Sequence, residues 1–320
     1  MLRPAALPWI FGLLALGLAG AAQAQSPPID AQVTQSAARA GGFDAAYRRA
    51  AETGDATAQY ALGLHHASAP PPARDDAVAV GWFRKSADQG MAAAQEKLAN
   101  MYRAGRGVPR DYAAARQWYE KAAAQNFPQA QNNLGFMYGQ GLGVRQDYTA
   151  ALGWYRKAAE QGYPLAQYNL ALIYDNGQGV AQDYGAAFVW YLRAANQGNA
   201  AAQNNVAYML RNGQGVKPDP GAAISWYHKA AARGDPSAQF NLGQMFETGQ
   251  GAGRDAVQAW RWYDLAAANG DADAATARDG LSADMTADEL ARAREMARAG
   301  PALLGPMQPA EPLRFAPDDL

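Results

Sequence analysis

The chain has 320 residues and a net charge of −1, and only 18% of its side chains are charged. This near-neutral balance excludes proteins that track nucleic-acid phosphates, which need a surplus of Lys and Arg along one face. The absence of cysteine excludes a disulfide framework and a lipid-modified cysteine anchor, so packing alone must stabilise the fold.

The first 24 residues have the pattern of a secretory signal peptide. Arg3 supplies the positive charge, the stretch 7–20 is apolar, and Ala22-Gln23-Ala24 is a small-residue cleavage site. Cleavage leaves Gln25 as the new N-terminus of a polar lead-in that runs to residue 38. An uncleaved anchor is the alternative, but the apolar run is short for a membrane span of about 20 residues. We therefore expect export, to the periplasm or else to the medium, without membrane insertion after cleavage.

Three residue types recur every 36 positions over the middle of the chain. The tryptophan series is Trp82, Trp118, Trp154, Trp190, Trp226 and Trp262. The glutamine series is Gln59, Gln95, Gln131, Gln167, Gln203 and Gln239, and the aspartate series is Asp75, Asp111, Asp147, Asp183, Asp219 and Asp255. This agreement indicates tandem repeats. We place the six repeats at 55–90, 91–126, 127–162, 163–198, 199–234 and 235–270.

The repeat over 163–198 shows why each unit is expected to be two antiparallel helices. Its first half carries an apolar stripe at helical spacing, formed by Ala166, Leu170, Ile173 and Tyr174. Gly177 ends this helix because glycine accepts the left-handed conformation, and Asp183 caps the next helix. The second half repeats the spacing at Ala187, Trp190, Tyr191, Ala194 and Ala195. Neither helix buries its stripe alone, so stacked repeats must share one core, with the tryptophan as its largest contribution.

Capping elements are expected at both ends of the array. Residues 39–54 match the second helix of a repeat and predict an N-terminal cap. Residues 271–300 resemble a first helix followed by another helix, which begins at the capping box Thr286-Ala287-Asp288-Glu289. The Pro-rich stretch 301–320 is expected to be a disordered tail.

The repeated unit resembles the Sel-1-like repeat, which is similar to the tetratricopeptide repeat. The clearest copy runs through Ala130-Gln131, Leu134-Gly135, Met137-Tyr138, Gly141-Leu142-Gly143-Val144, Asp147-Tyr148, Ala151, Trp154-Tyr155 and Lys157-Ala158-Ala159-Glu160-Gln161-Gly162. The resemblance covers roughly residues 43–281. The tetratricopeptide repeat has a period of about 34 and its Trp in the first helix, whereas this unit has its Trp in the second.

The resemblance implies an all-α solenoid, a right-handed superhelix whose first helices line a concave surface. It also implies a scaffold or adaptor in a bacterial envelope or secreted setting. Some exported members of the family carry one disulfide in each repeat and are linked to β-lactam binding. That link does not extend to this chain, which has no cysteine and no S-x-x-K or K-T-G pattern.

Two places depart from the repeat and are candidates for function. In the first repeat, Ala69-Pro70-Pro71-Pro72 replaces the Gly-rich turn and is either an exposed contact loop or a stiffened end of the array. In the sixth, Trp260 precedes Trp262 by two positions, so the two rings cannot share a helix face. Trp260 is expected either to pack on the C-terminal cap or to be exposed as a contact residue.

No catalytic, cofactor or metal site is expected. The string Gly139-Gln140-Gly141-Leu142-Gly143 resembles a dinucleotide fingerprint, but no strand is expected before it and the same turn recurs in other repeats. The three histidines, His65, His66 and His228, lack carboxylates at metal-ligand spacing. The six repeated tryptophans are interpreted as structural, because a residue present in every copy serves the packing that all copies share.

The candidate binding surface is a ladder of asparagines at the middle of the first helices, Asn133, Asn169, Asn205 and Asn241. Beside it lie side chains that differ between repeats, among which we select Phe136, Tyr168, Asn204, Tyr208 and Phe240. If this face is concave, the amides could hydrogen-bond an extended peptide backbone. The alternative is that the asparagines bond between neighbouring helices.

The sequence therefore predicts a non-catalytic interaction scaffold that binds a protein or peptide segment. A binder of cell-wall glycan or of a wall enzyme is the second hypothesis. A β-lactam or peptidoglycan hydrolase is the third, and it lacks a unique acid, base, nucleophile or metal set. Neither a nucleic-acid partner nor a cofactor is expected, the partner's identity stays open, and a monomer is favoured over an oligomer.

Overall fold

The computed structural model describes residues 45–298, and within them every regular element is a helix. The expected signal peptide, polar lead-in and Pro-rich tail lie outside these residues. The described chain divides into two compact units. One contains residues 45–170 and 178–180, and the other contains residues 171–177 and 181–298.

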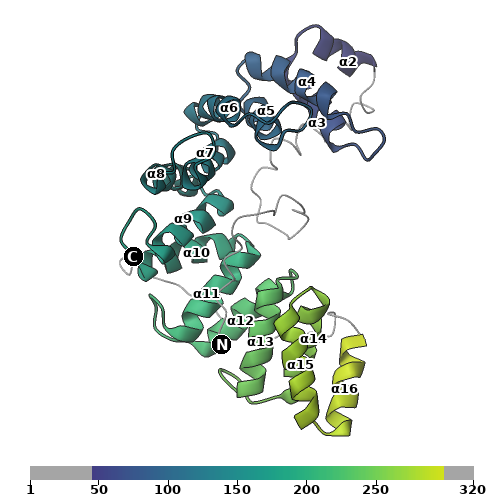
Figure 1. Cartoon of the computed structure of the whole chain (residues 1–320), viewed down its shortest axis with the longest axis vertical. Helices are drawn as coiled ribbons and strands as arrows, with labels where there is room; N and C mark the ends of the chain where they lie inside the picture. The colour runs from purple at the N-terminus through teal and green to yellow at the C-terminus, as the bar shows by residue number, and fades with distance from the viewer. Residues whose placement is uncertain (1–44, 299–320) are drawn as a thin grey trace. The chain divides into compact units, whose positions relative to one another are not determined.

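We call the first helix of each repeat the A helix and the second the B helix. The first unit holds the end of the N-terminal cap and the early repeats, as α2 (Ala45–Glu52), α3 (Ala56–Ser68), α4 (Asp76–Asp88), α5 (Ala92–Ala104), α6 (Tyr112–Ala124), α7 (Pro128–Gln140), α8 (Tyr148–Glu160) and the first half of α9 (Pro164–Asn176). Within this unit the A helices α3, α5 and α7 each pack against the B helix that follows (Figure 1).

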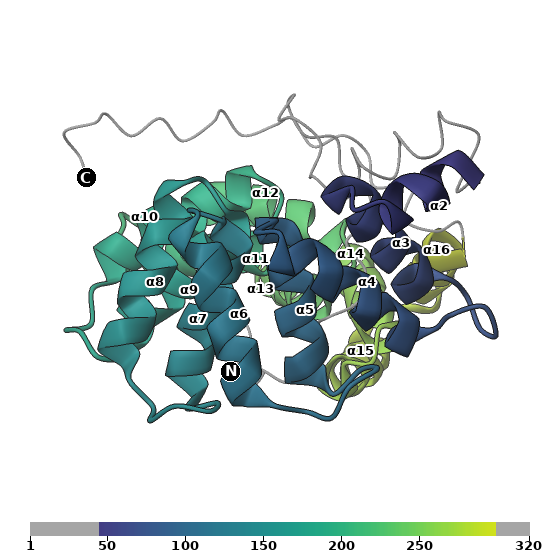
Figure 2. The ribbon, with the colours of Figure 1, turned by 90° about the horizontal axis from the view of Figure 1, so that it is seen from above.

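The second unit continues the same alternation to the C-terminal cap. After the end of α9 it holds α10 (Tyr184–Asn196), α11 (Ala200–Asn212), α12 (Pro220–Ala231), α13 (Pro236–Thr248), α14 (Ala256–Ala268), α15 (Ala272–Asp284) and α16 (Ala287–Arg298). The B helix α14 packs against both α15 and α16, so these two helices cover the last repeat (Figure 2). The all-α solenoid predicted from the sequence, with six helix pairs, is confirmed.

The repeated aspartates and glycines set the ends of the helices. Asp111 caps α6, because its carboxylate accepts hydrogen bonds from two backbone N–H groups at 2.9 and 3.0 Å. Gly141 ends α7 in the left-handed conformation, with φ of 67°. Gly143 also has φ of 67°, and a Cβ there would lie 2.7 Å from Cβ of Tyr112. The second glycine of each turn therefore lets one repeat pack on the start of the preceding B helix.

The repeated glutamine joins three helices. Nε2 of Gln131, on α7, donates to the carbonyl oxygen of Ala123 at the end of α6, at 3.4 Å. Oε1 of Gln131 accepts a hydrogen bond from Gln161, at the end of α8, at 2.7 Å. Gln59 and Gln95 make the same two contacts in the preceding repeats. These contacts explain why glutamine recurs at this position.

A buried aromatic residue directly follows the tryptophan in every repeat. These residues are at most 5% exposed, namely Phe83, Tyr119, Tyr155, Tyr191, Tyr227 and Tyr263. Trp226 and Trp262 are buried as well, but the first four repeated tryptophans are only half-buried. A cation covers the remaining face of each half-buried ring, as Lys121 does for Trp118 with Nζ 3.9 Å from the ring centroid. In these four repeats the tryptophan is therefore less buried than the aromatic residue that follows it, and its rank as the largest core contribution stays a prediction.

A glycine on the A helix makes room for this core aromatic residue. A Cβ on Gly135 would lie 2.8 Å from Cδ1 of Tyr155, which is closer than carbon atoms approach without displacement. Gly63 lies against Phe83 in the same way, at 2.5 Å. The Leu-Gly pair of the repeated unit is thus explained by close packing of the A and B helices.

Candidate protein-interaction surface

One face of each A helix stays accessible, and we call it the A-helix stripe. In α7 the stripe consists of Gln129, Asn133, Phe136 and Gln140, which follow helical spacing and are all partly or fully exposed. The corresponding residues of α9 are Leu165, Asn169, Leu172 and Asn176, and Leu165 is 41% exposed. In α11 the stripe contains Tyr208, which is half-buried. The stripe therefore presents polar, aliphatic and aromatic side chains that differ from repeat to repeat.

The asparagine ladder makes contacts between successive A helices. Three of its members donate from Nδ2 to a side chain 37 positions earlier, Asn133 to Glu96 at 3.3 Å, Asn169 to Asn132 at 2.9 Å and Asn241 to Asn204 at 3.3 Å. These contacts support the alternative that the asparagines bond between neighbouring helices. A role of Asn133 and Asn169 in peptide binding stays a prediction, because both side chains are partly exposed.

Four of the predicted contact residues are buried, so the expectation that they lie exposed on one face of the A helices is wrong. Asn204 and Asn241 are 0% exposed, Asn205 is 7% exposed and Phe240 is 6% exposed. Phe240 faces its own B helix, where its ring packs against Tyr263 with the centroids 5.5 Å apart. The partly exposed candidates are Asn133, Asn169, Phe136, Tyr168 and Tyr208.

Trp260 belongs to the C-terminal cap. Its side chain is 7% exposed and packs in the same apolar cluster as Leu281 of α15 and Ala293 of α16. Nε1 of Trp260 donates to Oγ of Ser282 at 2.7 Å, which satisfies the one polar atom of the indole. The alternative of an exposed contact residue is therefore wrong.

The proline turn of the first repeat is exposed and is held at its edges. Residues 70–72 are exposed, as a contact loop requires. Arg106, from the turn of the second repeat, donates to the carbonyl oxygen of Ala67 at 3.3 Å and to the carboxylate of Asp76 at 2.6 Å. The turn is therefore exposed, as a contact loop would be, and its two ends are fixed, as in a stiffened end of the array. A contact role stays a prediction.

The structure identifies a position that the sequence analysis missed. Sixteen residues before each core tyrosine stands a side chain that differs between repeats, in the series Arg103, Gly139, Asp175, Arg211 and Glu247. Three of these side chains bond to the tyrosine hydroxyl, Arg103 to Tyr119 at 3.2 Å, Asp175 to Tyr191 at 3.0 Å and Glu247 to Tyr263 at 2.6 Å. The signal is visible when the repeats are aligned at their period of 36 residues, because the charge at this position changes sign from repeat to repeat.

The surroundings of this series are partly desolvated. Burial raises the pKa of the Asp175 carboxyl group above its ordinary value, and the hydrogen bond from Tyr191 partly opposes this effect. Burial also lowers the pKa of the Arg211 guanidinium, which is 7% exposed. Charged side chains that are this deeply buried are uncommon unless an opposite charge or hydrogen bonds compensate them.

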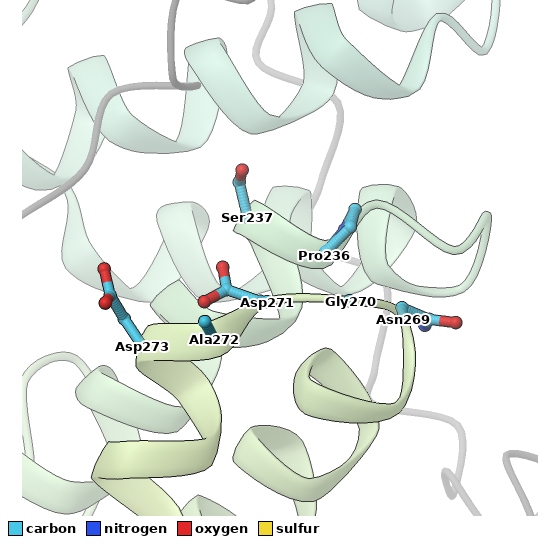
Figure 3. Close-up of a pocket in the computed structure, with 7 residues that line it drawn as sticks. All are labelled: Pro236, Ser237, Asn269, Gly270, Asp271, Ala272 and Asp273. Atoms are coloured by element: carbon cyan, nitrogen blue, oxygen red, sulfur yellow. The ribbon is translucent and has the colours of Figure 1, made fainter.

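The hollows detected in the described residues are formed by loops and helix starts. One, of about 260 Å³, lies where α13 and α15 begin and is lined by Pro236, Ser237, Asn269, Gly270, Asp271, Ala272 and Asp273 (Figure 3). Asn269 donates to Gln239 at 2.9 Å and Asp271 caps α15, so both side chains have structural roles. A second hollow, of about 390 Å³, lies between the start of α14 and α16. We assign no ligand to either hollow.

Residues 45–298 contain neither a cluster of metal-ligating side chains nor a membrane-spanning helix. No group of three or more His, Cys, Asp or Glu side chains there is placed to hold a metal ion. None of the helices of this stretch has the length and apolar character that a membrane crossing requires.

A family model described as the Sel1 repeat matches six consecutive copies, at 56–91, 92–127, 128–163, 164–199, 200–235 and 236–271. The chain belongs to the Sel1 repeat family. Each matched Sel1 copy begins one residue later than the boundary we drew, and the copies follow each other without a gap.

Solved structures of similar proteins have the same fold. A Sel1 repeat protein from Oxalobacter formigenes is 32% identical with a TM-score of 0.64, over 75% of this chain and 96% of that chain. A protective antigen present in uropathogenic Escherichia coli strains, displaying an SLR fold, is 33% identical with a TM-score of 0.53, over 84% of this chain and 68% of that chain. A search of curated proteins found no match. Sel1 repeat proteins are generally protein-interaction scaffolds and are typically non-catalytic.

Proposed function

We propose that this Sel1 repeat protein is a non-catalytic scaffold of the bacterial cell envelope that binds a peptide or protein segment along its A-helix stripe. One observation carries the proposal. The repeated polar residues are engaged in caps and interhelical hydrogen bonds, whereas Phe136, Leu172 and Tyr208, which differ between repeats at one position of the stripe, lie partly exposed. Residues that every copy shares maintain the solenoid, so the varied residues are the ones that select a partner.

The varied side chains have the chemistry of a protein-binding surface. Phe136 is a half-buried aromatic residue of the stripe, and Leu165 on the stripe of α9 is 41% exposed. Tyr168, also half-buried, lies beside the stripe on α9. Arg103 lies over the ring of Phe136, 5.8 Å from its centroid, so the aromatic face carries a neighbouring positive charge. Aromatic residues and arginine are enriched among the residues that dominate binding energy at protein interfaces.

The proposed location rests on the signal-peptide pattern of residues 1–24. The relative that is 33% identical is described as a protective antigen, which fits a protein outside the cytoplasm. N-terminal sequencing of the protein from the periplasmic fraction should find Gln25 as the first residue. A first residue of Met1 in a cytoplasmic fraction would contradict export.

Binding of a peptide segment can be tested with a display library of random twelve-residue peptides selected on the full chain. We expect enriched peptides whose affinity, measured by fluorescence anisotropy, falls at least tenfold in the double variant Phe136→Ala, Tyr168→Ala. The matched control is Gln117→Ala, at an exposed position of the B helix α6, which should leave affinity unchanged. Equal loss in the control, or no enriched peptide, would contradict the proposed surface.

The non-catalytic part of the proposal has its own test. Purified protein should neither hydrolyse nitrocefin nor digest muropeptides. Turnover of either substrate that persists after repurification would show that the protein is a hydrolase rather than a non-catalytic scaffold.

A further inference from the structure

Arg211 is a deeply buried guanidinium near the A-helix stripe of the second unit. It lies in the last turn of α11 and is 7% exposed. Its Nε donates to Oε1 of Gln250 at 2.7 Å, and its Nη1 lies 3.4 Å from Oε1 of Gln244. Gln244 occupies the stripe of α13, and Tyr208, one turn before Arg211, occupies the stripe of α11. The guanidinium therefore lies beneath the stripe, between two successive A helices.

The charge of Arg211 has no carboxylate partner within the described chain. Its acceptors are the amide oxygens of Gln250 and Gln244 and the hydroxyl of Tyr227, all of them neutral groups, and no ion pair to Arg211 is formed by residues 45–298. Other arginines of this protein do have such partners, as Arg106 contacts Asp76 at 2.6 Å and Arg278 contacts Asp264 at 2.9 Å. A guanidinium has five N–H donors, so Arg211 keeps donors for a further acceptor beyond these three partners.

Burying an arginine without a counter-ion opposes folding, because the charged form loses its hydration. The fold does not require this arginine, since the same position holds Gly139 in the third repeat and Asp175 in the fourth. Arg103, at the same position in the second repeat, is more exposed and lies against an aromatic ring. Arg211 is thus a costly group that is confined to one repeat, which is the pattern of a binding residue.

We propose that Arg211 binds a carboxylate of the partner peptide, with Tyr208 and Gln244 beside it on the stripe. The inference rests on the proposed function, because it assigns one chemical contact to the proposed peptide-binding surface. A carboxylate matches the planar guanidinium with two parallel hydrogen bonds and supplies the charge that the two glutamines lack. The carboxylate comes either from a Glu or Asp side chain or from the C-terminus of the peptide.

The test uses the full chain and matched pools of synthetic twelve-residue peptides. Two pools are random except at the central position, which is Glu in one pool and Gln in the other. Each pool is made with a free and with an amidated C-terminus, which separates the two sources of carboxylate. We expect one carboxylate-bearing pool to bind at least tenfold more tightly than its neutral counterpart. Arg211→Gln should remove that preference, whereas the control Arg145→Gln, at an exposed position in the turn of the third repeat, should retain it.

If Arg211→Gln fails to fold, an NMR titration of the wild-type protein tests the same contact. In the wild-type protein, the Nε–Hε NMR signal of Arg211 should shift on addition of the tightest carboxylate peptide and stay in place with its neutral counterpart. Equal binding of charged and neutral pools, or an unmoved Arg211 signal, would overturn this inference and leave the scaffold proposal standing. Failure of all pools to bind would overturn both.

Discussion

The side-chain amide of Gln161 donates to Oε1 of Gln131 at 2.7 Å and so joins the end of α8 to α7. Because Gln131 also donates to the carbonyl oxygen of Ala123 on α6, one buried side chain connects two successive repeats. The contact has the same period as the repeat, which makes it a source of the coupling between neighbours that holds a solenoid together.

The substitution Gln131→Ala should therefore destabilise the protein. It removes one hydrogen bond from Ala123, whose carbonyl oxygen still accepts from Asn126, and one from Gln161, whose amide still donates to Lys157. We expect a loss of about 1–2 kcal/mol in the free energy of unfolding. Urea unfolding followed by circular dichroism measures this loss. Gln140→Ala, at an exposed position of the same helix, is the control and should change stability by less than about 0.5 kcal/mol. A similar effect of both substitutions would show that the buried glutamine contributes nothing specific.

Two glycines of the same repeat should respond to alanine in opposite directions. A Cβ at Gly135 would lie 2.8 Å from Cδ1 of Tyr155, so Gly135→Ala should cost about 1–3 kcal/mol through overpacking. A Cβ at Gly153, within α8, would meet no atom within 4 Å. Gly153→Ala should therefore stabilise the protein by about 0.5–1 kcal/mol, because glycine is a poor helix former. Thermal unfolding of the two variants distinguishes the signs, and a stabilising Gly135→Ala would refute close packing of this helix pair.

His228 should make the protein less stable in acid. Its ring packs edge-on against Trp262, with centroids 5.0 Å apart, and burial lowers its pKa from 6.5 to about 4. The unfolded chain thus binds the proton more tightly than the folded one. Stability from this group is fully present above pH 6.5 and is lost as the pH falls toward about 4, by no more than about 3 kcal/mol.

The substitution His228→Phe removes the titrating group and keeps an aromatic ring against Trp262. Urea unfolding at several pH values between 7 and 4 should show a shallower decline in this variant than in the wild type. Gln117→Ala, at an exposed position and without a titrating group, is the control and should keep the wild-type slope. An unchanged slope in His228→Phe would assign the acid sensitivity to other groups.

Periodicity is the reason that the fold could be predicted so fully. Asp111, Gly141 and Gln131 each act through local geometry or through a contact repeated at a fixed offset. Six copies of the aspartate and the glutamine and five copies of the glycine therefore identify their structural roles. It was harder to predict which residues of each repeat are buried. Trp118 and Tyr119 are adjacent and both aromatic, and only the packing of the A helix against the B helix decides that the tyrosine is the more buried one.

The candidate site was predicted less well, because the exposure of its residues also depends on packing between helices. Asn133 and Asn241 occupy equivalent positions, but Asn133 is partly exposed whereas Asn241 is 0% exposed. Their exposure depends on the side chains of neighbouring repeats, which a single helical pattern does not contain. Arg211 escaped notice because its importance depends on an absent counter-ion, which can be recognised only when the contacts of the folded chain are known.

The bond between Trp260 and Ser282 should fix the C-terminal cap on the last repeat. Trp260→Phe keeps an aromatic ring in the apolar cluster but removes the N–H donor, and Ser282→Ala removes the acceptor. In a double-mutant cycle we expect a coupling energy of about 1 kcal/mol, because Ser282→Ala leaves the indole N–H without its acceptor, whereas in Trp260→Phe the Ser282 hydroxyl still donates to Arg278. Urea unfolding of the four proteins measures the coupling. If the two effects add without coupling, the 2.7 Å contact does not stabilise the cap and α15 is held by apolar packing alone.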